Sequence, residues 1–91
     1  MTQQYAIFRF SKKTGKVDTT LSCGALSLAK LYALQNTTST KNTIIIDAES
    51  GNVVFAVSGR KDGFPKVCDS PKMTAVSLGI TDDILQSVCT D

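Results

Sequence analysis

Histidine is absent from this 91-residue chain, and cysteine, proline and aromatic residues are few. Without histidine, Ser/His and Cys/His nucleophilic catalysis are excluded, and a general base would have to be a carboxylate, a lysine or a perturbed thiol. The three cysteines, Cys23, Cys68 and Cys89, lack CxxC spacing, so the usual zinc ligand set is missing. We therefore expect no metal and no cofactor. We expect buried thiols, with a Cys68–Cys89 disulfide as the alternative.

Long apolar runs are also missing. The longest uninterrupted run, from Val53 to Val57, is far shorter than the roughly 20 residues that a membrane-spanning helix needs. Residues 1–5 contain no basic stretch that leads into an apolar segment, so a secretory signal is not indicated. We expect a cytoplasmic protein with no membrane partner.

Motifs that carry catalysis are not evident. Asp82 and Asp83 are adjacent in a predicted helix and would point to different sides, while Asp47 and Glu49 flank a turn. Residues 58–63 hold two glycines and a lysine but lack the Gly-Lys-Ser/Thr ending in which the lysine meets a phosphate. The sequence therefore favours a protein that is not an enzyme.

The net charge is small, at +2, and it is unevenly distributed. Residues 1–72 hold all ten Lys and Arg residues and five acids, whereas residues 73–91 hold three acids and no basic residue. Extended phosphate binding needs a clustered basic face, so the net charge alone does not indicate a nucleic-acid partner.

Residues 42–59 are the clearest structural signal. Ile44 to Ile46 and Val53 to Val57 are β-branched and apolar runs on either side of Gly51, a pattern that predicts a hairpin with a left-handed glycine in its turn. Because the runs do not alternate with polar residues, both faces of these strands should be covered. One face can take a helix of this chain. We expect a second layer or a second subunit on the other face, because one copy offers too little material to cover both.

The rest of the chain supplies two further strands and two helices. Alternation predicts strands over 5–10 and 16–21, and helix formers predict a mostly buried helix over 24–35, capped by Ser22. In this helix Ala25, Leu28, Ala29 and Tyr32 form one apolar stripe, which Leu26, Leu31 and Ala33 widen. Thr81 can cap a final helix over 81–89. Residues 73–78 could be a short strand or the approach to that helix.

These elements predict one α+β domain over residues 1–91. Its order is ββαββ followed by a C-terminal helix, with an antiparallel sheet of about four strands packed on the central helix. In the long connection 60–72, two prolines forbid a central strand, and Lys66 to Cys68 is the one candidate for a short edge strand.

Basic residues interleaved with aromatic residues are the best functional hint. Lys16 and Lys72 belong to the two basic groups, which surround the first turn and the long connection. The candidate partner-binding residues are Arg9, Lys12, Lys13, Arg60, Lys61, Phe64 and Lys66. If the strand order brought both groups together, they would form a surface for phosphates, with Phe64 free to stack on a base. Phe64 could instead anchor a protein partner or fill the core, and we favour the core.

Three functional hypotheses follow. The first is a small non-enzymatic protein-binding or regulatory accessory protein that forms a homodimer through the second sheet face or an edge strand. The general type resembles small accessory proteins of bacteria and their phages. The alternative is a nucleic-acid-binding accessory protein that uses the basic turns. The second alternative is a small-ligand-binding domain with its site under residues 59–72.

Overall fold

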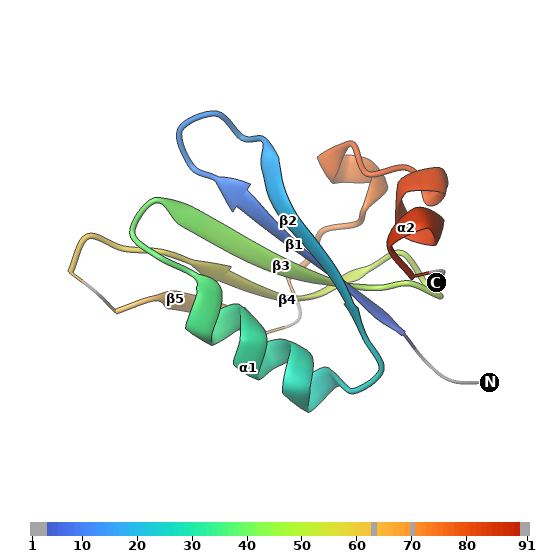
Figure 1. The fold of residues 1–91 in the computed structure, drawn as a ribbon, viewed down its shortest axis with the longest axis horizontal. Helices are drawn as coiled ribbons and strands as arrows, with labels where there is room; N and C mark the ends of the chain where they lie inside the picture. The colour runs from blue at the N-terminus through green and yellow to red at the C-terminus, as the bar shows by residue number, and fades with distance from the viewer. Residues whose placement is uncertain (1–3, 63, 70, 90–91) are drawn as a thin grey trace.

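The computed structural model describes residues 4–62, 64–69 and 71–89, which form one sheet flanked by helical segments (Figure 1). In chain order the elements are β1 (Tyr5–Ser11), β2 (Val17–Cys23), α1 (Leu26–Asn36), β3 (Lys41–Asp47), β4 (Val53–Ser58), β5 (Lys66–Asp69), the 3-10 helix η1 (Val76–Leu78) and α2 (Asp82–Cys89). The α+β fold and the order of its first elements are confirmed.

The sheet is antiparallel throughout, with strand order β2-β1-β3-β4-β5. It has five strands instead of about four, because the edge-strand candidate in the long connection pairs with β4 as β5. All four residues of β5 are exposed. Pro65 and Pro71, which have no amide hydrogen to donate, stand on either side of this strand and limit its length.

The central hairpin forms as the sequence predicts. β3 and β4 pair from Asn42 with Ser58 to Ile46 with Val53, and Gly51 adopts a φ of +75° in the turn between them. This is the left-handed region, where a side chain would be strained. The Gly51 amide donates a 2.8 Å hydrogen bond to the Asp47 carbonyl, which closes the turn.

Helix α1 covers one face of the sheet through its small residues. Ala29 and Ala33 are fully buried against a cluster that includes Ile7, Ile45 and Phe55. Alanine lets the helix axis approach the strands closely, and the larger leucines therefore face away. Leu28 and Leu31 are 60% and 51% exposed, so the prediction of a mostly buried helix with these leucines in its apolar stripe is wrong.

The predicted cap of α1 is also wrong. Ser22 belongs to β2, the helix begins at Leu26, and Ala25 at its N-cap makes no side-chain hydrogen bond. Thr81 does cap α2, because its hydroxyl accepts a 3.4 Å hydrogen bond from the Ile84 amide. Asp82 and Asp83 lie in the first turn of α2, where the helix dipole favours negative charge.

The other face of the sheet is covered by residues 73–89 of the same chain. Ala75, Ile80 and Leu85 are buried in a cluster with Phe8 and Ile46. Residues 73–78 are thus the approach to the final helix and include η1. Residues 43–46 of β3 are buried, whereas Val54 and Ala56 of β4 are half-buried, so the expected cover of both faces is complete for β3 and partial for β4. The second layer comes from the same chain, so the expectation that a second layer needs more material than one copy offers is wrong where residues 73–89 pack.

None of the three cysteines forms a disulfide. Cys68 is exposed on β5, and Cys23 and Cys89 are partly buried, so the expectation of three buried thiols is wrong and no Cys68–Cys89 disulfide is present.

Candidate functional site

The strand order brings three loops together at one end of the sheet. The β1–β2 turn (12–16), the α1–β3 loop (37–40) and the start of the β4–β5 loop (59–62) meet there. The Lys12 amide donates a 2.9 Å hydrogen bond to the Thr40 carbonyl, and its ammonium group donates to the Gly59 carbonyl. We call the segments 9–18, 37–41 and 59–66, without residue 63, the basic end.

Gly59 holds two of these loops in direct backbone contact. It is buried, and its amide donates a 3.1 Å hydrogen bond to Oδ1 of Asn42. A β-carbon at this position would lie 1.5 Å from the Thr38 carbonyl oxygen and 2.9 Å from that of Lys41. The close approach therefore requires glycine, and it fixes the α1–β3 loop against the β4–β5 loop.

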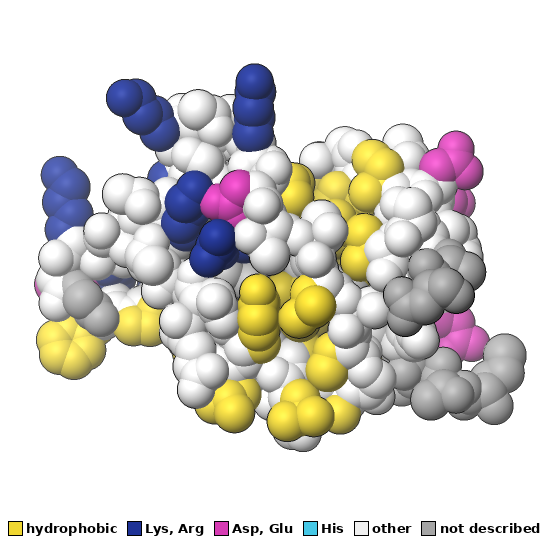
Figure 2. Space-filling model, viewed as in Figure 1, with side chains coloured by type: hydrophobic (Ala, Val, Ile, Leu, Met, Phe, Trp, Pro, Cys, Tyr) yellow, Lys and Arg dark blue, Asp and Glu magenta, His cyan; other side chains and the backbone are white. Residues whose placement is uncertain are grey.

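Positive charge gathers at the basic end. Its three segments contain eight of the ten Lys and Arg residues and two of the eight acids, a formal balance of +6. Figure 2 shows Lys and Arg side chains gathered toward the left around one acidic side chain, and further Asp and Glu side chains at the right. The net charge of the chain is only +2, but the basic end alone has a balance of +6. The molecule therefore has a concentrated basic surface at one end.

Asp18 ties two of these cations to the sheet surface. Its carboxylate accepts a 2.8 Å hydrogen bond from Nε of Arg9 and forms an ion pair with Lys41. The hydrogen bond from Lys41, then that from Arg9, holds the pKa of Asp18 well below its usual range. Arg9 and Lys41 are consequently positioned by Asp18, and part of their charge is already neutralised.

Asp18→Asn should remove an acid-sensitive contribution to stability. Because the folded-state pKa is lowered, this contribution is fully present above the ordinary carboxyl pKa of about 4 and is lost as the pH falls toward the folded-state pKa. We therefore expect the stability difference between wild type and variant to be constant from about pH 5 to pH 7 and to shrink below about pH 4. Denaturant titrations at several pH values measure it, and a pH-independent difference would contradict the assignment.

The candidate site residues fall into two groups. Arg9, Lys12 and Arg60 are engaged, since Arg9 pairs with Asp18, Lys12 donates to Gly59 and Arg60 forms a 3.1 Å ion pair with Asp62. The other group comprises Lys13, Lys61 and Lys66, together with Lys16; within the part of the chain that the structure describes, these four lysines form no ion pair and are exposed.

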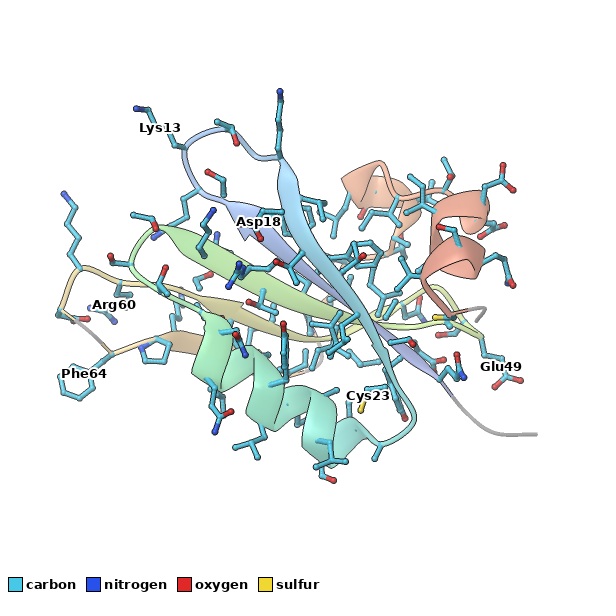
Figure 3. All side chains as sticks on the ribbon, viewed as in Figure 1. Lys13, Asp18, Cys23, Glu49, Arg60 and Phe64 are labelled. Atoms are coloured by element: carbon cyan, nitrogen blue, oxygen red, sulfur yellow. The ribbon has the colours of Figure 1, made fainter. Side chains whose placement is uncertain are left out.

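Phe64 is 75% exposed, so the prediction that it fills the core is wrong. Its amide donates a 3.0 Å hydrogen bond to Oδ1 of Asp62, and the following Pro65 restricts the backbone. Figure 3 shows the Phe64 ring pointing away from the body of the protein near Arg60. Two interpretations remain for Phe64: its ring stacks on a base, or it anchors a protein partner.

Sequence reasoning missed Lys41 and the part played by Asp18. Lys41 begins β3, so pairing β3 antiparallel to β1 places it beside the β1–β2 turn. Its position directly before the β-branched run was the available signal. Lys72, counted with the long connection, lies outside the basic end beside Val53 and Met73.

Two hollows open at the basic end. A polar hollow of about 290 Å³ lies between residues 37–39 and 59–61, with Pro65 at its margin. A larger one, of about 400 Å³, has an apolar floor that includes Phe10, Ile44 and Ala56, and Lys12 lies at its rim. Arg60 and Lys61 line the first hollow and Lys12 lines the second, so a ligand in either hollow would meet a basic residue.

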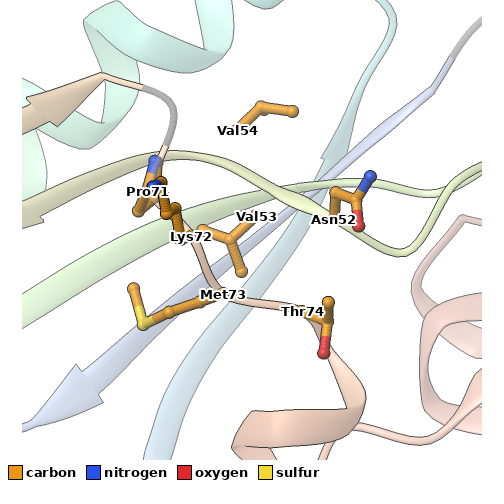
Figure 4. Close-up of a pocket in the computed structure, with 7 residues that line it drawn as sticks. All are labelled: Asn52, Val53, Val54, Pro71, Lys72, Met73 and Thr74. Carbon is orange, nitrogen blue, oxygen red and sulfur yellow. The ribbon is translucent and has the colours of Figure 1, made fainter.

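A third hollow lies away from the basic end, where residues 71–74 run along the start of β4 (Figure 4). Its volume is about 360 Å³, and Lys72 is the one charged residue among those that line it. The Val53 amide donates a 2.9 Å hydrogen bond to the Met73 carbonyl, so this hollow is the seam between β4 and the C-terminal segment.

A metal site and a membrane-spanning helix are both absent from the part of the chain that the structure describes. Among residues 4–62, 64–69 and 71–89, three or more Cys, Asp or Glu side chains do not come together in a way that could hold a metal ion. Neither helix of this described part has the length and apolar character to span a bilayer. Comparison of the chain with protein-family models, curated proteins and solved structures gives no match.

Proposed function

We propose that the protein is an accessory protein that binds single-stranded nucleic acid through its basic end. The observation that carries this proposal is the convergence of the β1–β2 turn and the β4–β5 loop, which places Lys13 and Lys16 at the same end as Lys61 and Lys66. A cationic surface that follows the backbone, joined to an exposed aromatic ring, is the usual arrangement for single-strand binding.

The exposure of the Phe64 ring favours single-stranded over double-stranded nucleic acid as the ligand. A ring that is 75% exposed can stack on a base only when that base is unstacked and turned outward. The apolar hollow at Phe10, which Lys12 also lines, offers a second place for a base. Such contacts tolerate any base, so we expect weak sequence preference.

Fluorescence anisotropy with short mixed-sequence oligonucleotides tests the proposal. If Lys13, Lys16, Lys61 and Lys66 each meet a phosphate, log K should fall with log salt with a slope of about −3, a loss of roughly 50-fold between 50 and 200 mM salt. Replacing Lys13, Lys61 and Lys66 with alanine should reduce this slope by about 2. Lys61→Ala changes a single lysine within the basic end, and Lys72→Ala is its matched control outside the basic end. Lys72→Ala should leave the salt slope unchanged.

Phe64 has a separate signature in the same assay. Phe64→Ala should weaken binding by about 5- to 150-fold, which corresponds to the 1–3 kcal/mol of one stacked base, without changing the salt slope. The chain has no tryptophan, so Phe64→Trp introduces a single fluorophore whose quenching reports stacking. Asp18→Asn should strengthen oligonucleotide binding, because it releases Arg9 and Lys41 to contact phosphate groups.

Salt-insensitive binding, or no binding to single strands at low ionic strength, would overturn the proposal. Salt-sensitive capture of an acidic peptide without any binding to oligonucleotides would instead assign the basic end to a protein partner.

A second candidate function, protein binding, is favoured by a different observation. Helix α1 exposes leucines on the side that faces away from the sheet, and this surface does not overlap the basic end.

A further inference from the structure

The outer face of α1 carries a ridge of exposed leucines. Leu28, Leu31 and Leu34 are 60%, 51% and 41% exposed and recur every third residue, so they lie in one row along the helix. Figure 2 shows hydrophobic side chains gathered over the region of α1, below the basic cluster. We call these three residues the leucine ridge. A row of this kind can pack into the groove of another helix.

The ridge is electrically neutral. Ser27 and Gln35 flank it on the outward side, and the nearest lysine of the helix, Lys30, turns toward the sheet, where it pairs with Asp69 at 3.3 Å and lies 5.2 Å from the Phe55 ring centre. A strongly acidic or basic partner would therefore find no opposite charge on this face. A second copy of the same neutral row would meet no repulsion.

The direction of α1 favours one arrangement of two copies. The helix starts beside the C-terminal end of β2, near Asp47, and ends in the loop that belongs to the basic end. If two copies pack their α1 helices antiparallel, the basic end of each copy lies toward the opposite end of the other copy, where Glu49 lies (Figure 3). A parallel arrangement would bring the two basic ends together, at a cost in electrostatic energy.

We propose that the leucine ridge binds the ridge of a second copy, with the α1 helices antiparallel about a two-fold axis at Leu31. Leu31 then packs on the partner's Leu31, and Leu28 packs on the partner's Leu34. The contact is isologous and closed, so assembly stops at a dimer. Both basic ends stay exposed in this dimer, so the inference is independent of the proposed function and adds a bivalent geometry to it.

Sedimentation equilibrium across a range of concentrations tests the dimer. The weight-average mass should rise from the chain mass of 9.7 kDa toward twice that value. Leu31→Lys places two like charges against each other at the axis and should raise the dissociation constant at least about tenfold. The control is Val76→Lys, at a residue that is 77% exposed on η1, and it should not change the mass. A monomer at every concentration, or a dimer unaffected by Leu31→Lys, would overturn the proposal.

Engineered cysteines test the antiparallel register without relying on a disruptive substitution. In a background in which Cys23, Cys68 and Cys89 are serine, Leu31→Cys should form a disulfide-linked dimer under mild oxidation. Leu28→Cys and Leu34→Cys should each stay uncrosslinked alone and should crosslink when mixed. Efficient self-crosslinking of both single variants would show a parallel pairing, and no crosslinking of any of them would remove the contact; either result overturns the proposal.

Discussion

Phe8→Ala is expected to lower the free energy of unfolding by about 3–5 kcal/mol. Phe8 is 1% exposed on the side of the sheet that residues 73–89 cover, and it packs in one cluster with Ile44 and Leu85. Its removal would leave a cavity between the sheet and the C-terminal segment that neither can close without giving up strand or helix geometry. The measurement is equilibrium denaturation in urea, followed by circular dichroism.

The matched control is Phe64→Ala, which removes the same atoms from a side chain that is 75% exposed. Its effect on stability should lie within about 0.5 kcal/mol, whereas its effect on oligonucleotide binding should be large. The two phenylalanines therefore separate stability from binding. Equal destabilisation by both variants would contradict the placement of Phe64 on the surface.

Gly59→Ala is expected to destabilise the protein by roughly 3 kcal/mol and to disorder the basic end. The added methyl group would meet the Thr38 carbonyl oxygen at 1.5 Å, and backbone on both sides leaves no flexible side chain to give way. The loops must separate, which breaks the hydrogen bonds that Gly59 makes with Asn42 and Lys12. Urea denaturation and the loss of amide protection in residues 37–41 measure the effect.

Gly51→Asn is the control for this second variant. Gly51 is required for its φ of +75°, and a β-carbon there meets nothing within 4 Å. Asparagine tolerates the left-handed region, so this substitution should cost less than about 1 kcal/mol. Because Gly59 is required for contact and not for conformation, Gly59→Asn should be at least as harmful as Gly59→Ala. Tolerance of either substitution at Gly59 would show that the loops do not meet there.

The strands could be predicted because their signals are local. The β-branched runs of β3 and β4, and the glycine between them, determine a hairpin from a few neighbouring residues. The same holds for α2, where Thr81 caps the helix and the acids of its first turn follow directly. Each of these elements depends on contacts between residues that lie close together in the chain.

The layer that covers the second face could not be predicted in the same way. Ala75, Ile80 and Leu85 recur every fifth residue, which matches neither the helical nor the strand period. Their burial depends on packing with Phe8 and Ile46, which lie far away in the chain. The rotation of α1 was missed for a related reason. Apolar residues are spread around the helix, so the hydrophobic pattern does not identify the side that faces the sheet. The small size of Ala29 and Ala33 decides which side approaches the strands.

The residues of the candidate site could be predicted from the sequence, but their positions relative to one another could not. The lysines of the two turns are evident from composition, whereas their convergence depends on strand order, which local patterns do not encode. The pairing of Arg9 and Lys41 with Asp18 likewise needs β1, β2 and β3 to be adjacent. Phe64 was misplaced because its flanking Gly63 and Pro65 fit a buried turn as well as an exposed one.

The short strand β5 has a consequence for how the molecule avoids uncontrolled polymerisation. An edge strand with unpaired amide and carbonyl groups is a template to which strands of other chains can add. A long, flat edge strand promotes fibril formation in this way. Here the edge strand is four residues long, begins with Lys66 and is interrupted by proline on both sides. The sheet therefore offers a growing fibril little backbone to pair with along this edge.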